Sequence, residues 1–566
     1  MSTHRVDQQR DQIIQAKAEG RGATFRTYVK LSGPGWLQSA ITLGGGSLAG
    51  SLYLGIIGGY DMMWLQPLMM IFGVVMLSAI AHVTLSTAER PFPALNSHVS
   101  PVLGWGWIIA TMMANLVWAM PQFSLGTAAL RQNLGVLTFE GGEYAAAVLL
   151  FVAAAAAVWL YDKGGLAYKI FDSLLKLMVG LIVLSFFLVV YNMSASSVGL
   201  EWDRILRGFI PNPKLIFEPA ESLRALVADS SAPDYWRDAV VSAQRDRMVA
   251  AAATAVGINM TFLLPYSMLK RGWDRHFDGL ARFDLSTGLF VPFLLATSCV
   301  VIAAASQFHA NPESGLIAVH QSEGRAATEL PPKLIDAYEG NLQAMLNAGG
   351  RNDAMADLPE ADRILAATLI ERDALDLANS LEQLAGPRVS HTIFGIGVVG
   401  MAISSIIILM LINGFAVCEM VGHSSEGWLY RFGCLLPGIS GAFGALFLWS
   451  GKAKFYLAVP TSRFGMVLLP IAYIAFFCLM NNPRLLKESM PRGGTRVMWN
   501  LLMGIGVALA LTGAAISILN DKARIPRTEI YVRHLAIGLV GALLVAGGVI
   551  QLARMNDAKR SAQDRE

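Results

Sequence analysis

The chain has 566 residues, of which 54% are hydrophobic and 15% are charged, and its formal net charge is +3. Soluble domains carry about 25% charged residues, and here the apolar residues fall into about twelve blocks that approach the roughly 20 residues a bilayer-spanning helix needs. This composition excludes an ordinary soluble protein and predicts an all-α polytopic membrane protein. The four cysteines have no C-x-x-C spacing, so we expect neither a disulfide framework nor a thiolate metal site.

In chain order, residues 1–30 are polar and basic and contain no apolar stretch typical of a signal peptide. We expect them to form a cytosolic segment. Spans 1–7 should follow within residues 31–305, and spans 8–12 within residues 391–554, before a cytosolic tail at 555–566. The predicted spans are 33–57, 62–87, 101–130, 144–161, 166–191, 249–269, 284–305, 391–418, 428–450, 455–480, 496–519 and 532–554.

The orientation of the chain follows from its Lys and Arg residues near the span ends. They cluster in the N-terminal segment, after the sixth span, after the tenth span and in the tail. With twelve spans these four segments lie on one side, and the positive-inside rule assigns that side to the cytosol. We therefore expect a multi-pass protein of the cell membrane with both termini in the cytosol.

Two polar inserts should lie on the opposite side. The first covers about 193–248. The second, 306–390, contains thirteen acidic and six basic residues, and its stretch 358–386 has the apolar spacing of a helix, which predicts a short helical cap. The acidic insert would serve as a lid or cation-attracting vestibule, or it would simply be a solvated addition to the fold.

Three consecutive glycines, Gly44, Gly45 and Gly46, interrupt the first predicted span. Backbone polar groups inside a bilayer must be satisfied by the protein, so an opened helix is tolerated only where it lines a cavity. The second half-helix would begin near Ser47 and direct its N–H groups at an anion or a carbonyl oxygen. The carbonyls near Thr42 would favour a cation. Small residues also suit close helix packing, which is the alternative explanation.

The sixth span contains a second candidate interruption. Pro265 removes one helical hydrogen bond, and the polar residues Asn259, Thr261, Tyr266 and Ser267 surround it. Interruptions in two spans that lie five helices apart are expected of an inverted five-plus-five repeat with its substrate site at mid-membrane.

Several motifs now support a family resemblance. They are "GPGWLQSA" at 33–40, "GFIPNP" at 208–213, "LLPYSML" at 263–269 and the segment 394–415, which contains Ser404 and Ser405. Between residues 25 and 515, outside the acidic insert, the chain resembles the Nramp (natural resistance-associated macrophage protein) metal-ion transporters of the LeuT-fold group. The resemblance implies a LeuT-like inverted five-plus-five helix repeat with two extra C-terminal helices.

The same resemblance indicates an altered site. The family's Asp-Pro-Gly-Asn motif of the first helix falls on Gly44–Ser47, so its metal-binding carboxylate is absent. Its methionine and histidine of the sixth helix fall on Leu264 and Tyr266, and its aspartate of the third helix falls near Met120, beside Gln122. With neutral side chains at these places, a partly hydrated divalent ion or a small polar or zwitterionic solute fits better than a dehydrated transition metal.

Two further pairs are candidates for the pathway or a gate. Asp172 and Lys176 have the i, i+4 spacing of a helical ion pair, and charges within a span are functional by default; a structural pair and a gate element both remain open. Asn115 and Gln122 share one helix face and would line the pathway or bond to a neighbouring helix. Ser404 and Ser405 join this group through the resemblance.

We therefore expect a secondary transporter that moves a metal ion, which we take to be divalent, by alternating access. The alternatives are transport of a small polar or zwitterionic organic solute, or a non-transporting sensor or scaffold. No nucleotide motif or nucleophile–base–acid set occurs, so no enzyme activity and no cofactor are expected; the expected partners are the lipid bilayer and a small ion or solute, without nucleic acid. The predicted substrate-binding residues are Thr42, Gly44, Gly45, Gly46, Ser47, Asn259, Thr261, Leu264, Pro265, Tyr266 and Ser267.

Overall fold

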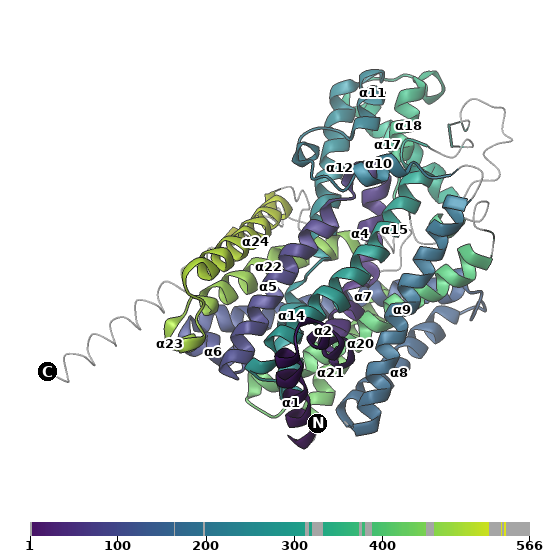
Figure 1. The fold of residues 1–566 in the computed structure, drawn as a ribbon. Coiled ribbons are helices and arrows are strands. Elements are labelled where there is room, and N and C mark those ends of the chain that lie inside the picture. Colours follow the sequence, from purple (N-terminus) through teal and green to yellow (C-terminus); the bar gives the residue numbers. More distant parts are fainter. Residues whose placement is uncertain are drawn as a thin grey trace.

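The computed structural model describes residues 3–163, 165–195, 199–311, 332–372, 388–448 and 458–519, with a few isolated positions outside these ranges. Within that part of the chain every regular element is helical and no strand occurs. The helices form one long bundle, with additional short helices at one of its ends (Figure 1). The prediction of an all-α membrane protein is confirmed.

Among the described residues, ten helices are long and apolar enough to cross a bilayer, and a bent pair makes an eleventh span. Nearly all of the predicted twelfth span, 532–554, lies outside the described residues. The spans are α3 (Pro34–Thr42) with α4 (Gly45–Gly58), α5 (Leu65–Thr87), α7 (Pro101–Ala128), α8 (Gly142–Lys163), α9 (Gly165–Ala195), α12 (Pro233–Ala253) with α13 (Ile258–Lys270), α14 (Asp278–Asp284) with α15 (Val291–Phe308), α20 (Phe394–Val421), α21 (Gly427–Phe443), α22 (Ala458–Met480) and α24 (Gly493–Leu519).

The first span is broken at the glycine triplet. Helix α3 ends at Thr42, α4 begins at Gly45, and the two axes differ by 58°. Gly44 has an extended backbone with φ −115° and ψ −178°, which ends the helical hydrogen-bonding pattern. The second half-helix thus starts two residues before the predicted position near Ser47.

The sixth span is also interrupted, but not where the sequence suggested. Helical structure stops at Thr254–Gly257, between α12 and α13, whereas Pro265 lies inside α13. The prediction of a break at Pro265 is therefore wrong. A proline removes only one hydrogen bond from a helix, and the packed neighbours of α13 keep its remaining turns helical.

Both interruptions lie inside protein. Helix α4 packs against α12 and α15, and α13 packs against α5 and α7. Every residue from Ser47 to Gly58 is buried, as is every residue from Ile258 to Met268. Irregular backbone at membrane depth is tolerated under these conditions, because neighbouring groups replace the missing hydrogen bonds.

One end of the bundle, which we call the insert side, carries short helices from both polar inserts (Figure 1). The first insert contributes α10 (Trp202–Arg207) and α11 (Glu221–Ala228), and its last part forms the start of α12. The acidic insert contributes α18 (Glu360–Thr368), inside the stretch predicted as a cap, and α17 (Pro332–Ala348), which was not predicted.

The acidic insert is anchored to the bundle by buried contacts. The carboxylate of Asp362 accepts hydrogen bonds from Trp236 Nε1 of α12 (2.5 Å) and from the backbone N–H of Ser231 (3.0 Å). Tyr53 of α4 donates to the carbonyl oxygen of Arg372 (2.7 Å). The insert therefore contacts both broken spans directly.

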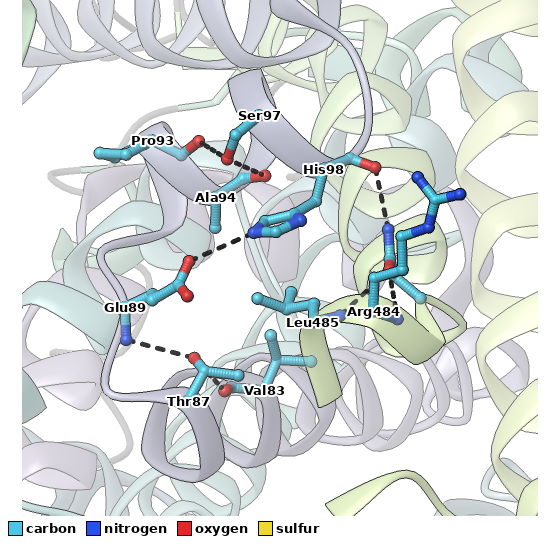
Figure 2. Close-up of polar contacts among 10 residues, drawn as sticks. Val83, Thr87, Glu89, Pro93, Ala94, Ser97, His98, Arg484 and Leu485 are labelled. Carbon is cyan, nitrogen blue, oxygen red and sulfur yellow. Dashed lines mark hydrogen bonds and ion pairs between the residues drawn. The ribbon is translucent and has the colours of Figure 1, made fainter. Parts of the chain in front are cut away.

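The opposite end, which we call the N-terminal side, carries α1 (Thr3–Glu19), α2 (Arg21–Leu31), α6 (Pro91–His98) and α23 (Pro483–Leu486). Figure 2 shows how the corner between α5 and α6 is fixed: the Glu89 backbone N–H donates to Thr87 Oγ1 (3.2 Å), and His98 Nε2 lies 3.6 Å from the Glu89 carboxylate. Asn482 donates from Nδ2 to the His98 carbonyl (2.9 Å), which joins this corner to α23.

Candidate substrate site at the broken helices

The end of α3 presents carbonyl oxygens that lack ordinary helical partners. Ser47 Oγ donates to the carbonyl of Thr42. Ser405 Oγ of α20 lies 3.5 Å from the carbonyl oxygen of Ala40 and 3.4 Å from that of Ile41. The two hydroxyl groups have one hydrogen each for three backbone oxygens, and the Ser405 contacts are long for a hydrogen bond, so the Ala40 and Ile41 carbonyls are only weakly bonded. All five oxygen atoms lie at the break.

The start of α4 is capped by a side chain from α7. The Gly45 N–H donates to Gln122 Oε1 at 2.8 Å. The first N–H groups of a helix have no partner within the helix and carry partial positive charge. Gln122 supplies a neutral acceptor where the sequence suggested open N–H groups. This bond joins α7 to the break, and a role of Gln122 in the pathway stays a prediction.

The break in the sixth span adjoins the break in the first. A Cβ atom placed on Gly46 would lie 3.4 Å from Thr254 Cγ2, and Thr254 begins the interruption between α12 and α13. Met260, in the first turn of α13, places its sulfur 3.1 Å from Thr42 Oγ1. Gln38 Nε2 makes a long contact of 3.5 Å with the Met260 carbonyl.

The glycines at the first break are packed closely. A Cβ on Gly44 would lie 2.2 Å from Ser405 Oγ, and one on Gly45 would lie 2.7 Å from Leu125 Cδ2 and 3.0 Å from Gln122 Oε1. At Gly46 the closest atoms would be at 3.4 and 3.5 Å, which is ordinary contact. A methyl group at Gly44 or Gly45 would therefore displace side chains that α20 and α7 place against the opened backbone.

Of the predicted residues in the sixth span, two lie near the break. Asn259 and Thr261 are fully buried in the first turn of α13. Asn259 Oδ1 accepts the N–H of Met260 (2.9 Å), and Thr261 Oγ1 accepts from Trp107 Nε1 (3.0 Å). These bonds fix the first turn of α13 to itself and to α7.

The remaining four predicted residues, Leu264, Pro265, Tyr266 and Ser267, lie further along α13. Leu264 is about 9 Å beyond Ile258 at 1.5 Å per residue. Tyr266 stacks between Phe262 and Phe415, with ring centroids 4.4 and 6.1 Å apart. These four residues therefore lie further along α13 than Asn259 and Thr261, and their part in the substrate site stays a prediction.

The predicted pathway residues divide into two groups. Gln122 and Ser405 contact the break directly. Ser404, the neighbour of Ser405, donates only to the Met401 carbonyl of its own helix at 3.2 Å. Asn115, two turns from Gln122, donates to Asn413 Oδ1 of α20 at 2.8 Å, so it joins two helices away from the break.

Asp172 and Lys176 form the predicted ion pair, with 2.9 Å between Lys176 Nζ and Asp172 Oδ2. They also bind other spans at the N-terminal side. Lys176 Nζ donates to the Ser32 carbonyl (3.1 Å), and Asp172 Oδ1 lies 3.3 Å from Arg271 Nη2. The pair connects α9 to the start of the first span and the end of α13.

Sequence reasoning missed Met260, Gln38 and Thr254. Each of them is buried and contacts the other broken span. The sequence offered only one signal for two of them, which is that they lie near predicted site residues. Gln38 is one turn before Thr42, and Met260 immediately follows Asn259.

The donor atoms gathered at the two breaks are hydroxyl, amide and carbonyl oxygens together with one thioether sulfur. Within the described ranges, no three His, Cys, Asp or Glu side chains come together as a metal-binding group. Oxygen ligands suit hard cations such as Mg²⁺ and Ca²⁺, and a thioether suits softer metals. The site offers neutral ligands that can replace part of an ion's water shell.

The fold and the paired broken spans define a LeuT-type helical membrane protein. The chain matches the family described as "Natural resistance-associated macrophage protein-like" (Nramp) over residues 35–334 and 363–519. Because the match covers most of the chain, this protein belongs to the Nramp family, as the motifs suggested.

Solved structures agree on the fold. The chain is similar to the manganese transporter of Eremococcus coleocola in complex with an aromatic bis-isothiourea substituted compound, with a TM-score of 0.62, 15% identity, and coverage of 95% of this chain and 96% of that chain. A mutant of the same transporter gives a TM-score of 0.61 at 15% identity with the same coverage. A search of curated protein sequences finds no match to this chain.

Proposed function

We propose that this protein is a secondary transporter that moves a divalent, partly hydrated metal ion across the cell membrane by alternating access. The cluster of neutral oxygens at the first break carries the proposal: the carbonyls of Ala40, Ile41 and Thr42, with the hydroxyls of Ser47 and Ser405. Family membership and the likeness to a manganese transporter support a metal ion as cargo.

The proposed cargo follows from ligand chemistry. If Ser47 and Ser405 rotate their hydroxyl hydrogens away from the carbonyls, both hydroxyl oxygens and the freed carbonyl oxygens become available to a cation. Neutral oxygens compensate only part of the hydration energy of a divalent ion, so the ion keeps several of its waters, as Mg²⁺ usually does. The sulfur of Met260 adds one donor that favours Mn²⁺ over Mg²⁺. The family's acidic ligand is absent, since its position falls on Gly44.

Alternating access would use the two breaks as hinges. On the insert side, we take the hydrogen bond from Tyr53 of α4 to the Arg372 carbonyl as the closing contact. On the N-terminal side, which we assign to the cytosol with both termini, the backbone N–H groups of Gly33 and Gly35 donate to Asp284 at 3.0 and 2.6 Å. A bound ion would cross the membrane when the contacts on one side open while those on the other side stay closed.

A second candidate cargo is a small zwitterionic solute. The observation in its favour is the cap on α4: the Gly45 N–H is held by the neutral, flexible side chain of Gln122. If Gln122 swings away, the helix N-terminus becomes a site for a carboxylate, as in transporters whose half-helices bind the carboxylate of their substrate.

Uptake into proteoliposomes tests the proposal. Purified protein is reconstituted, and uptake of Mn²⁺, Mg²⁺ and a panel of amino acids is measured against empty vesicles. We expect saturable divalent-cation uptake that falls strongly in Ser405→Ala and stays close to wild type in Ser404→Ala. The two serines are neighbours and equally buried, but only Ser405 contacts the break.

The proposal fails if neither ion is carried, or if both serine variants behave alike. Uptake of amino acids without uptake of cations would favour the zwitterionic cargo. No transport of any substrate, with a folded protein, would favour a sensor or scaffold.

A further inference from the structure

Lys270, the last residue of α13, extends its ammonium group into a cage of three aromatic rings. The Nζ atom lies 4.7 Å from the ring centroid of Tyr161, 4.9 Å from that of Tyr430 and 5.5 Å from that of Phe415. All three distances are within the range of an attractive cation–π interaction, about 6 Å. The rings come from α8, α21 and α20, none of which is a broken span.

The cage is rigid. The rings of Phe415 and Tyr430 lie 5.4 Å apart and those of Tyr161 and Phe415 lie 6.2 Å apart, and all three residues are buried. Behind them α20 and α21 approach so closely that a Cβ on Gly414 would lie 2.3 Å from Cys434 Sγ. The cage therefore belongs to a packed block of helices into which one lysine of another helix is inserted.

The position of Lys270 matters because α13 begins at a break. Lys270 lies about 18 Å along the helix from Ile258, so a hinge at Thr254–Gly257 displaces the Lys270 end of α13 more than any other part. A contact at this end opposes the hinge motion most strongly, because it acts at the greatest distance from the hinge. Desolvated cation–π contacts are the stronger ones, and the buried rings of the cage exclude water.

We propose that Lys270 in its aromatic cage is a releasable lock that holds α13 closed at the N-terminal side, and that this side opens only when the ammonium group leaves the cage. This inference deepens the proposed function and rests on it, because alternating access is the reason for α13 to move. It adds the positive charge of Lys270, held by rings from three helices, to the Asp284 hydrogen bonds that close this side.

The neighbouring residue connects this lock to the first span. Arg271 Nη2 lies 3.3 Å from Asp172 of α9, and the Arg271 guanidinium is packed so close to Gly33 that a Cβ there would lie 2.0 Å from Nη1. Lys176, paired with Asp172, donates to the Ser32 carbonyl. Withdrawal of Lys270 would draw Arg271 with it, so the start of α3 and the end of α13 would loosen together.

Hydrogen–deuterium exchange of the full-length protein in lipid nanodiscs, without substrate, tests this lock. We compare wild type with Lys270→Met, which keeps an unbranched chain but removes the charge, and with Lys270→Arg, which keeps a cation for the rings. Lys214→Met, an exposed lysine on the insert side, is the matched control. Tyr161→Leu and Tyr161→Phe remove and keep one ring of the cage.

For Lys270→Met we expect exchange in α13 and at residues 32–42 to rise by about tenfold, the effect of losing a well-formed cation–π contact, while α8, α20 and α21 stay protected. Tyr161→Leu should give the same pattern, and Lys270→Arg, Tyr161→Phe and Lys214→Met should match wild type. Unchanged exchange in Lys270→Met would overturn the proposal, as would Lys270→Arg exchanging as fast as Lys270→Met, or a uniform rise in all spans.

The measurement does not depend on transport. If the lock behaves as expected but no cargo is carried, the proposed function fails and the lock stands. If uptake is found and exchange is unaffected by these variants, the lock fails and the proposed function stands.

Discussion

The substitution Gly45→Ala should show whether the break in the first span is part of a functional site or only a place where helices pack closely. Gly45→Ala places a Cβ atom 2.7 Å from Leu125 Cδ2 and 3.0 Å from Gln122 Oε1. The neighbour Gly46→Ala places the same atom at 3.4 Å from Thr254 Cγ2. Neither glycine has a positive φ, so the two substitutions differ in packing and not in backbone strain.

The expected magnitudes follow from these distances. Overpacking at Gly45 costs about 1 kcal/mol, the low end of the usual range, because Leu125 Cδ2 and Gln122 Oε1 are ends of side chains that can shift. Displacing Gln122 from the Gly45 N–H adds about 0.5–1.5 kcal/mol. At Gly46 the methyl group fits, and replacing glycine in a helix returns up to about 1 kcal/mol. Since about 1.4 kcal/mol corresponds to a tenfold change, uptake by Gly45→Ala should fall about tenfold to hundredfold.

The assay is divalent-cation uptake into proteoliposomes, with thermal unfolding of each variant in detergent as the measure of stability. Gly45→Ala should lose uptake while its unfolding stays cooperative, and Gly46→Ala should retain both properties. Wild-type uptake by Gly45→Ala, or equal losses in the two variants, would refute the argument that α7 and the opened backbone form one closely fitted site.

The other predictions concern residues around that site. Gln122→Leu removes the acceptor for the Gly45 N–H and should lower uptake about tenfold. Gln122→Glu keeps an acceptor at this position and should retain most of the wild-type uptake. An equal loss of uptake in both variants would contradict the role of Gln122 as the cap of α4. Asp362→Ala leaves the Trp236 and Ser231 donors without their acceptor, so it should lower the free energy of unfolding by about 2–4 kcal/mol. It should also make the acidic insert sensitive to limited proteolysis. An unchanged digestion pattern would show that other contacts anchor the insert. Burial lowers the pKa of His309 from its ordinary value of 6.5, so the unfolded chain binds the proton more readily than the folded chain. The free energy of unfolding should therefore fall as the pH drops below about 6.5. On acidification the Tm of His309→Asn should drop less than that of wild type, and an identical pH profile of Tm in both proteins would contradict this prediction.

The insert-side anchoring bears on the choice between a lid and a solvated addition. The contact between Tyr53 and the Arg372 carbonyl ties the acidic insert to the outer part of α4. Both a lid and a solvated addition can make this contact, so the choice between them stays open in the structure. Uptake measured with the Asp362→Ala variant would distinguish them, because only a lid requires the anchored insert for transport.

The spans and the first break could be predicted because their signals are local. Hydropathy marks each apolar block, and three consecutive glycines weaken a helix wherever they occur. The resemblance also identified the correct family. The unpredicted helix α17 had a local signal as well, because its buried residues Leu334, Tyr338, Leu342 and Met345 recur every three or four positions.

The break in the sixth span could not be predicted, because its cause is not local. The sequence 254–257 contains one glycine and no proline. In the folded bundle it packs against distant neighbours such as Trp118, whose ring atom Cη2 would lie 2.6 Å from a Cβ on Gly257. Proline was a misleading marker: Pro121, Pro265 and Pro470 all lie inside helices in this structure.

The pairing of Met260 with Thr42 was inaccessible to sequence reasoning for the same reason. The two residues are 218 positions apart, and only the folded bundle brings them together. Likewise, Ser404 and Ser405 are chemically identical in the sequence, and only the structure distinguishes the one that contacts the break.

The most direct test of the central claim is isothermal titration calorimetry of the purified protein with MnCl₂ and with MgCl₂, in wild type and Gly45→Ala. The neutral oxygen cluster predicts saturable binding of a divalent ion to wild type and its loss in Gly45→Ala. No heat of binding with either ion, or the same binding isotherm in both proteins, would contradict a cation site at the broken helices.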